Sequence, residues 1–206
     1  MVRFFLLTVV ASMLVSAAVA GKYNPVLSIG DKAPAWQGLE NVDGSKHSLA
    51  DMKQPVVVLV FTCNSCPYAV DYEARLKSLS AAIDQEKVAI VAVNVNKIEE
   101  DLPTAMKLRA QEQGFRFPYL FDGSQKIARD YGATYTPEFF VLDEDRKVVY
   151  MGAMDDSTDA SKVTKHYVND AIAAALQQKV PAVSETVAIG CRIRFERIRR
   201  RRKTSR

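Results

Sequence analysis

The chain has 206 residues, of which 48% are hydrophobic and 25% are charged; this is the balance of one soluble globular domain and excludes a disordered chain. Its formal net charge is +4, yet residues 192–206 hold nine Lys or Arg and one Glu and so carry +8. The rest of the chain is therefore mildly acidic, at −4, and the basic character belongs to a C-terminal tail and not to the domain.

The N-terminus has the features of a secretory signal peptide. Arg3 precedes an apolar stretch over residues 4–15, and small residues follow it at 17–21. This order predicts cleavage after Ala20, and no basic stop-transfer flank follows. A permanent membrane anchor is the alternative, because residues 3–20 are just long enough to span a bilayer. We expect an exported protein, periplasmic or otherwise extracytoplasmic, in a compartment that permits disulfides, with no nucleic-acid partner.

Strand and helix patterns alternate through the rest of the chain. A hairpin with an Asp-Gly turn is predicted over residues 36–49. The run Val56–Phe61 is apolar without polar alternation, which is typical of a central strand buried on both faces. From Pro67 to about Gln85, apolar residues recur at helical spacing. The later patterns predict strands over 88–95, 119–121, 138–142 and 147–151, and helices over 99–113, 124–131 and 166–176, with Gly114 and Gly132 as helix ends. This order predicts an α/β sandwich with a mixed sheet.

Two cysteines stand at the predicted junction of the central strand and the following helix, in the sequence Cys63-Asn64-Ser65-Cys66-Pro67. A C-x-x-C turn brings two sulfurs within bonding distance, and the positive end of a helix stabilises a thiolate. We assign Cys63, expected at an exposed mouth with a lowered pKa, as the attacking thiol, and Cys66 as the more buried resolving thiol. Asn64 and Ser65 help to set the stability of the thiolate. Pro67 suits the first helical turn, because the N–H that it lacks would be unpaired there.

A static disulfide and half of a zinc site are the alternatives for this pair. Zinc needs three or four protein ligands, and the further candidates His47, His166 and Cys191 are at no paired spacing. We therefore predict redox chemistry with no metal and no cofactor. Three charged residues are candidates for tuning the thiols, although no spacing singles one out: Glu73, Lys97 and Glu138.

Four stretches of the sequence resemble the redoxin (AhpC/TSA) family of thioredoxin-like proteins. They are GDKAPAWQGLENVDGSKHSL, VVVLVFTCNSCPYAVDYEARL, YGATYTPEFFVLD and VVYMGAMDDS, within residues 27–178. A C-x-x-C after a hydrophobic strand, with Thr136-Pro137 before another strand, is typical of the fold, and the hairpin and Asp155-Asp156 are typical of the redoxin branch. The resemblance implies a thioredoxin-like three-layer sandwich with a central mixed β-sheet and an N-terminal β-hairpin. We divide the chain into a signal peptide (1–20), this domain (21–190) and a basic tail (191–206).

The same resemblance implies a role for the residues before the second of these strands. Pro137 is expected to be a cis-proline that faces the cysteine pair, with a trans proline as the alternative, and Thr136 is expected to hydrogen-bond an extended substrate chain. The implied function is that of exported TlpA-like and ResA-like proteins, which exchange dithiols and disulfides with protein substrates and with a thiol-disulfide electron donor or acceptor. A peroxiredoxin-like thiol peroxidase is one alternative. The peroxiredoxin signature has a Thr three positions and a Pro seven positions before its reactive Cys, and when that Cys is aligned on Cys66 this chain has Cys63 and Leu59 at those positions. A non-catalytic thioredoxin-fold binding module is the other.

The third cysteine, Cys191, lies past the last predicted helix. Free cysteines are among the most buried residues, so we expect it to be buried and inert, with a resolving role as the alternative. In the tail, Ile193, Phe195 and Ile198 alternate with arginines, a pattern that fits contact with an anionic membrane surface. A solvated, unfolded end is slightly favoured over that contact, because terminal blocks of charge usually stay unfolded.

Overall fold

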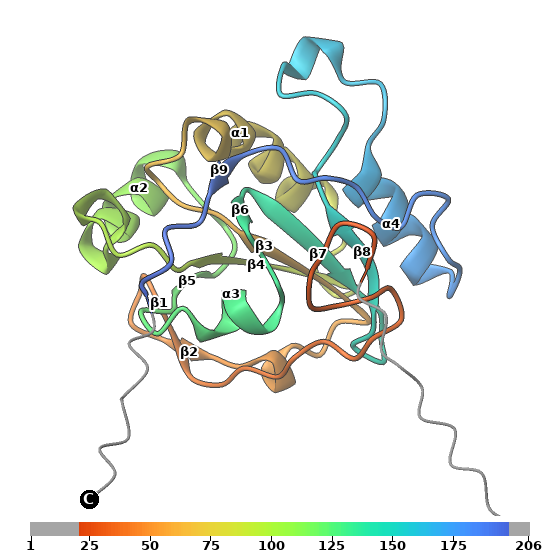
Figure 1. Cartoon of the computed structure of the whole chain (residues 1–206), viewed down its shortest axis with the longest axis horizontal. Helices are drawn as coiled ribbons and strands as arrows, with labels where there is room; N and C mark the ends of the chain where they lie inside the picture. Colours follow the sequence, from red (N-terminus) through yellow and green to blue (C-terminus); the bar gives the residue numbers. More distant parts are fainter. Residues whose placement is uncertain (1–20, 198–206) are drawn as a thin grey trace, which may run out of the picture.

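The computed structural model describes residues 21–197, which are built around a mixed β-sheet (Figure 1). Its strands are β1 (Leu39–Asn41), β2 (Lys46–His47), β3 (Val56–Phe61), β4 (Val88–Asn94), β5 (Tyr119–Phe121), β7 (Glu138–Leu142) and β8 (Val148–Gly152). The strand order is β2-β1-β5-β4-β3-β7-β8; β4 runs parallel to β3 and β5, and the other pairs are antiparallel. A separate small sheet joins β6 (Tyr135–Thr136) to β9 (Cys191–Arg192).

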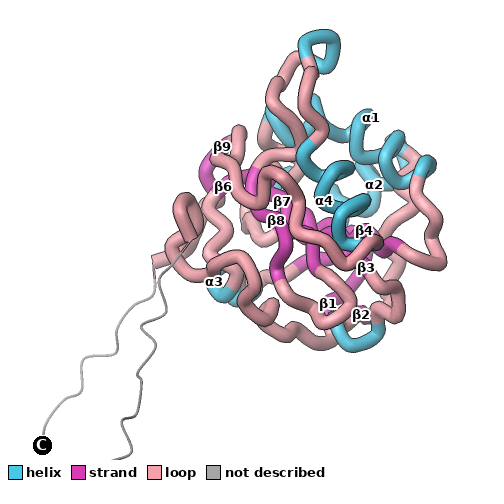
Figure 2. The backbone as a smooth tube through the Cα atoms, turned by 90° about the vertical axis from the view of Figure 1, so that its right-hand side faces the viewer, coloured by secondary structure: helices cyan, strands magenta, loops and turns pink. Residues whose placement is uncertain are grey.

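Helices cover both faces of the large sheet and complete three layers (Figures 1 and 2). They are α1 (Pro67–Ala82), α2 (Pro103–Gln113), α3 (Lys126–Asp130) and α4 (Tyr167–Leu176). In β3, Val56, Val58 and Val60 belong to the core shared with α1, α2 and α4, whereas the alternate residues belong to the core shared with α3 and the N-terminal segment. Successive side chains of a strand point to opposite faces, so a strand between two helical layers is apolar throughout. The predicted α/β sandwich with a mixed sheet and an N-terminal hairpin is confirmed.

One predicted helix is divided where a proline interrupts it. The helix predicted over 99–113 is divided into a 3-10 turn, Glu99–Asp101, and α2. Leu102 between them is extended (φ −75°, ψ 158°), because a residue before proline disfavours the helical conformation. Gly114 ends α2 in the left-handed region (φ 64°), as predicted.

The C-terminal segment crosses the molecule and packs on it. The predicted basic tail includes residues 191–197, and in this part Ile193 is buried and the Arg129 guanidinium lies 4.4 Å from the centre of the Phe195 ring. Gln125 Nε2 donates a hydrogen bond to the Arg194 carbonyl oxygen (2.9 Å). Apolar side chains between the arginines therefore fasten this part of the tail to the domain. The predicted signal peptide, 1–20, and the rest of the tail, 198–206, lie outside the described residues. None of the helices within residues 21–197 is both long and apolar enough to cross a bilayer.

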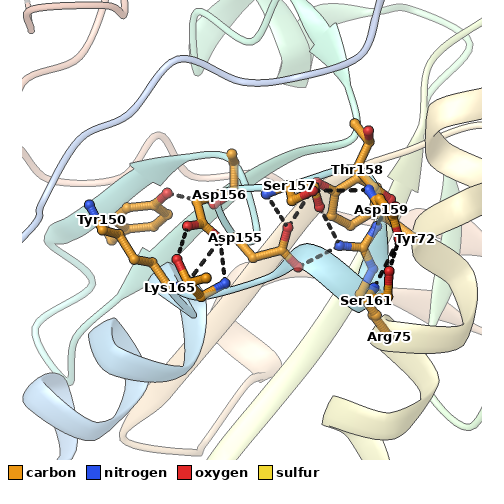
Figure 3. Close-up of polar contacts among 12 residues, drawn as sticks. Tyr72, Arg75, Tyr150, Asp155, Asp156, Ser157, Thr158, Asp159, Ser161 and Lys165 are labelled. Atoms are coloured by element: carbon orange, nitrogen blue, oxygen red, sulfur yellow. Dashed lines mark hydrogen bonds and ion pairs between the residues drawn. The ribbon is translucent and has the colours of Figure 1, made fainter.

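A buried polar cluster fixes α1 to the segment between β8 and α4 (Figure 3). The Tyr72 hydroxyl donates to Asp155 Oδ1 (3.0 Å), and the Arg75 guanidinium donates to Asp155 Oδ2 (2.6 Å). Arg75 also donates to the carbonyl oxygens of Ser157 (2.8 Å) and Thr158 (2.9 Å). Asp155, one of the residues that carried the resemblance, thus holds in place the helix on which the cysteine pair depends.

Candidate active site

The C-x-x-C turn lies where β3 ends and α1 begins. Cys66 is the N-cap of α1, with extended backbone angles (φ −90°, ψ 117°), and Pro67 is the first helical residue. The predicted strand-to-helix junction and the predicted place of Pro67 are confirmed. Proline at this position removes an N–H that the helix could not pair, and it leaves the positive end of the helix next to the turn.

The Thr136-Pro137 peptide bond is cis, as predicted, and Thr136 contacts both thiols. The Cys66 thiol donates a hydrogen bond to the Thr136 carbonyl oxygen (3.0 Å), and Cys63 Sγ lies 3.3 Å from the Thr136 hydroxyl oxygen. Both cysteines are free thiols. The turn, the helix end and the cis-proline segment therefore meet at one pair of reduced sulfurs.

Both cysteines of the pair are buried, with 2% of each residue exposed, so the prediction that Cys63 lies at an exposed mouth is wrong. Both sulfurs lie against Thr136. The hydrogen bond shared with Cys66 raises the pKa of Cys63, and burial and the negative charge of Asp101 act in the same direction. The same bond acts in the opposite direction on Cys66 and lowers its pKa, and Cys191 contributes to that lowering. The two thiols titrate together, and the one that keeps its proton stabilises the other as a thiolate.

A buried carboxylate holds the turn in place. Asp101 is fully buried, and its Oδ1 accepts hydrogen bonds from the backbone N–H groups of Asn64 (2.7 Å) and Ser65 (3.1 Å). Its Oδ2 accepts the Ser65 hydroxyl (2.6 Å). Hydrogen bonds to a charged group are roughly twice as strong as neutral ones, so this carboxylate fixes the backbone of the turn. No motif or spacing in the sequence points to Asp101; the acidic run at 99–101 after a buried strand is the available signal.

The two motif residues between the cysteines act by fastening the turn. Asn64 Nδ2 donates to the Glu100 carbonyl oxygen (2.8 Å), and Asn64 Oδ1 accepts the Tyr119 hydroxyl (2.9 Å). Burial raises the pKa of Tyr119 well above its usual range, so the hydroxyl stays protonated and remains a donor. Asn64 and Ser65 therefore hold the sulfurs in position through their side chains.

Glu138, a candidate for tuning the thiols, directly follows the cis-proline. Its Oε2 accepts hydrogen bonds from the backbone N–H groups of Thr134 (2.8 Å) and Tyr135 (2.9 Å), so it braces the segment that carries Thr136. Burial raises the pKa of Glu138 to about 7. The other two candidates are held in ion pairs, Glu73 with Arg109 (2.7 Å) and Lys97 with Glu196 (3.0 Å).

The third cysteine lies beside the pair. β9 pairs antiparallel with β6, with Cys191 opposite Thr136, and Cys191 packs against the cluster of Cys63, Cys66 and Ala69. Cys191 is half-buried, so the expectation of full burial is wrong, because β9 lies at the surface end of this cluster. Burial raises the pKa of its thiol to about 11, and a hydrogen bond to Cys66 contributes. The same strand covers the backbone of Thr136, the residue expected to bind substrate.

The two histidines lie elsewhere in the fold. The His47 ring, in β2, is 3.0 Å from the Ser45 hydroxyl oxygen, and His166 is the residue before the first turn of α4, with no side-chain capping hydrogen bond. Across residues 21–197, no group of three or more His, Cys, Asp or Glu is arranged to hold a metal ion.

Comparison with known proteins gives the family. Residues 29–151, more than half of the chain, match AhpC/TSA. The chain belongs to the AhpC/TSA family. The thiol-disulfide oxidoreductase ResA of Bacillus thuringiensis (strain Al Hakam) is 31% identical over 126 residues, which are 60% of this chain and 68% of ResA. A "putative peroxiredoxin" of Mycobacterium tuberculosis (strain ATCC 25618 / H37Rv) is 30% identical over 140 residues, which are 60% of this chain and 83% of that protein. The crystal structure of an uncharacterized conserved protein from Geobacillus kaustophilus has a TM-score of 0.77 and 34% identity, over 84% of this chain and 95% of that chain.

This AhpC/TSA domain has the thioredoxin-like fold. Its similarity to ResA places it in the redoxin family, near the thiol-disulfide oxidoreductases. The matched segment contains the cysteine pair and the cis-proline. It ends at Met151, so α4 and the strand that carries Cys191 lie beyond it.

Proposed function

We propose that the chain is an exported thiol-disulfide oxidoreductase, which exchanges dithiols and disulfides with protein substrates through Cys63 and Cys66. The proposal rests on one juxtaposition: both sulfurs of the pair contact Thr136, directly before the cis-proline, at 3.0 Å from its carbonyl oxygen and 3.3 Å from its hydroxyl oxygen. The similarity to ResA, which is named as a thiol-disulfide oxidoreductase, supports the same activity.

The proposed chemistry takes place at sulfur atoms. In the reducing direction, the thiolate of the pair attacks one sulfur of a substrate cystine, and a mixed disulfide forms while the other substrate sulfur leaves and takes up a proton. The second thiol of the pair then loses its proton and attacks the protein sulfur of the mixed disulfide. A Cys63–Cys66 disulfide forms, and the substrate departs with two thiols. The two electrons that the pair has given up are replaced by a thiol-disulfide electron donor; the oxidation of a substrate dithiol is the same sequence in reverse.

We place the substrate chain along Thr136 and Pro137, where an extended strand can hydrogen-bond the backbone. In the dithiol form, β9 occupies this edge, with Cys191 opposite Thr136. β9 has only two residues, and its pairing with β6 is the contact that a substrate strand would have to replace. Displacement of β9 is therefore proposed as the step that admits the substrate.

Export rests on the signal features of residues 1–20. Protein recovered from the periplasm of a bacterial host should begin at Gly21, and an intact N-terminus would contradict this part of the proposal.

The Lys and Arg residues within 199–206 are proposed to contact an anionic membrane, each contributing about 1 kcal/mol near such a surface. Binding to anionic liposomes should weaken with salt and be lost when 199–206 are deleted; binding that survives the deletion would contradict the contact.

Reduction of insulin disulfides by dithiothreitol, followed by turbidity, tests the activity. The wild-type chain should accelerate it, and Cys63→Ser and Cys66→Ser should each abolish the acceleration. Ser78→Ala, at an exposed position of α1, is the matched control and should keep it. A wild-type rate no faster than dithiothreitol alone would overturn the proposal in favour of a non-catalytic binding module. Equilibration with glutathione then gives the reduction potential of the pair, which distinguishes a reductant from an oxidant.

The similarity to the Mycobacterium tuberculosis protein favours a second candidate, a peroxiredoxin-like thiol peroxidase. When the chain is aligned on Cys66, the Thr and Pro positions of the peroxiredoxin signature hold Cys63 and Leu59. Leu59 is fully buried in β3, where it packs in the core. We therefore expect hydrogen peroxide consumption close to background. Fast consumption that is lost in Cys66→Ser would support the peroxidase instead.

A further inference from the structure

Cys66 has a cysteine neighbour on each side. Cys63 shares its C-x-x-C turn, and Cys191 arrives from the C-terminal strand and packs against the same cluster. The thiols of both neighbours act to lower the pKa of Cys66. These are the three cysteines of the chain, so every thiol that it possesses meets at this one place.

The docking of Cys191 is built into the backbone around it. The N–H of Ile193 donates to the Thr134 carbonyl oxygen (2.9 Å), and the Ile193 side chain is buried. On the other side of Cys191, a Cβ on Gly190 would overlap the Thr136 carbonyl group. Glycine therefore allows β9 to approach β6 closely enough for the third sulfur to reach the cluster.

The three sulfurs differ in their access to solvent. Cys63 and Cys66 are each 2% exposed, whereas Cys191 is only half-buried. A disulfide confined to Cys63 and Cys66 would lie beneath the surface. A disulfide that includes Cys191 would lie nearer to any partner that approaches from outside.

We propose that Cys191 is the third thiol of an internal disulfide relay, which takes over the disulfide from the buried pair. The relay rests on the proposed function, which supplies the Cys63–Cys66 disulfide as its starting point. The Cys191 sulfur, after losing its proton, attacks Cys66 Sγ; the Cys66–Cys191 bond forms, the Cys63–Cys66 bond breaks, and the Cys63 sulfur takes up a proton. One disulfide replaces another, so the step needs no additional oxidant or reductant.

The relay has a definite pH dependence. The thiolate, and not the thiol, is the attacking species. Burial is the largest cause of the raised pKa of Cys191, and it persists when Cys66 is held in a disulfide, so the Cys191 thiolate is scarce at neutral pH. The rate of the internal transfer should therefore rise about tenfold for each pH unit, as long as the pH stays below the pKa of Cys191.

Oxidation of the full chain by oxidised glutathione, followed by an acid quench, alkylation and peptide mass spectrometry, tests the relay. Wild type should lose two of its three alkylation sites and yield both the Cys63–Cys66 and the Cys66–Cys191 peptides, with the second forming faster at higher pH. Cys63→Ser should lose both remaining sites through a Cys66–Cys191 disulfide within one chain. Cys66→Ser should keep both of its sites, because the shared sulfur is gone. The wild-type arm requires no substitution and so stands even if a variant folds poorly.

The outcomes separate the relay from the proposed function. If Cys63→Ser keeps both sites, or joins two chains through Cys66, while Cys191→Ser loses both sites, the relay is wrong and the exchange chemistry of the pair stands. If Cys191→Ser keeps both sites while Cys63→Ser loses both, the Cys63–Cys66 couple is wrong, and the relay loses its starting disulfide with it.

Discussion

The carboxyl group of Glu138 should make the stability of the fold depend on pH. Burial raises its pKa from the ordinary 4.5 to about 7, and only 6% of the residue is exposed, so solvent screens it little. The difference between these values corresponds to about 3 kcal/mol of free energy of unfolding, at about 1.4 kcal/mol for each pH unit. The perturbation is Glu138→Gln, which removes the titration. The amide oxygen can still accept both backbone N–H bonds, because a single carboxylate oxygen accepts them in wild type.

The sign follows from which state binds the proton more tightly. Between about pH 4.5 and 7, the folded chain holds the proton of Glu138 and the unfolded chain has released it. This contribution to the free energy of unfolding is therefore full below about pH 4.5 and is lost as the pH rises through about 7. Relative to wild type, Glu138→Gln should gain about 3 kcal/mol when the pH is raised from about 4 to about 8.

Urea unfolding at these two pH values, with the thiols kept reduced, measures the effect. The single tryptophan, Trp36, is buried and reports unfolding by its fluorescence. Glu86→Gln, at an exposed position, controls for the loss of one negative charge. If the difference between Glu138→Gln and wild type changes by less than about 1 kcal/mol between the two pH values, burial does not hold this proton and the reasoning is refuted.

Three further changes test other parts of the site. Asp101→Asn removes a charge that raises the pKa of Cys63, so iodoacetamide should alkylate that thiol at lower pH than in wild type. An unshifted alkylation profile would contradict this role of Asp101. The same change weakens the hold on the turn and should lower the free energy of unfolding by about 1–3 kcal/mol. Asp155→Asn removes the anion beside a largely buried guanidinium and should cost about 3 kcal/mol in urea, whereas Asp84→Asn, in an exposed pair, should cost less than about 1 kcal/mol. Equal costs would show that burial does not matter there. Gly190→Ala should detach β9 from β6 and speed alkylation of the buried pair, and an unchanged rate would contradict the close approach.

The framework of the site could be predicted because local patterns determine it. The run Val56–Phe61 is apolar at every position, which suits only a strand covered on both faces, and all of its residues are fully buried. Pro67 directly after the second cysteine marks the first turn of a helix. These features need only neighbours in the sequence, so the junction that presents the pair was correctly predicted.

The depth and the chemical surroundings of the pair could not be predicted in the same way. Asp101 is brought under the turn by the packing of α2 and the preceding 3-10 turn, and no spacing relates it to Cys63. The burial of Cys63 depends on how closely Thr136 approaches, and that distance is set by the sheet and not by the C-x-x-C motif. A motif predicts which atoms can react. The contacts that decide their protonation come from distant segments.

The same distinction explains why Gly190 and Cys191 have to be considered together. A cysteine on a loop that passes over the site at a greater distance would not reach the other two sulfurs, and its sequence position predicts only a buried, inert thiol. The missing Cβ of Gly190 lets the backbone of β9 pair with Thr136, and this pairing places the next side chain against Cys66. The Thr136 carbonyl oxygen also accepts a hydrogen bond from the Cys66 thiol, so this one residue positions both Cys66 and Cys191. Any change that moves β9 away from β6 should therefore expose Thr136 to a substrate strand and, at the same time, move Cys191 away from Cys66.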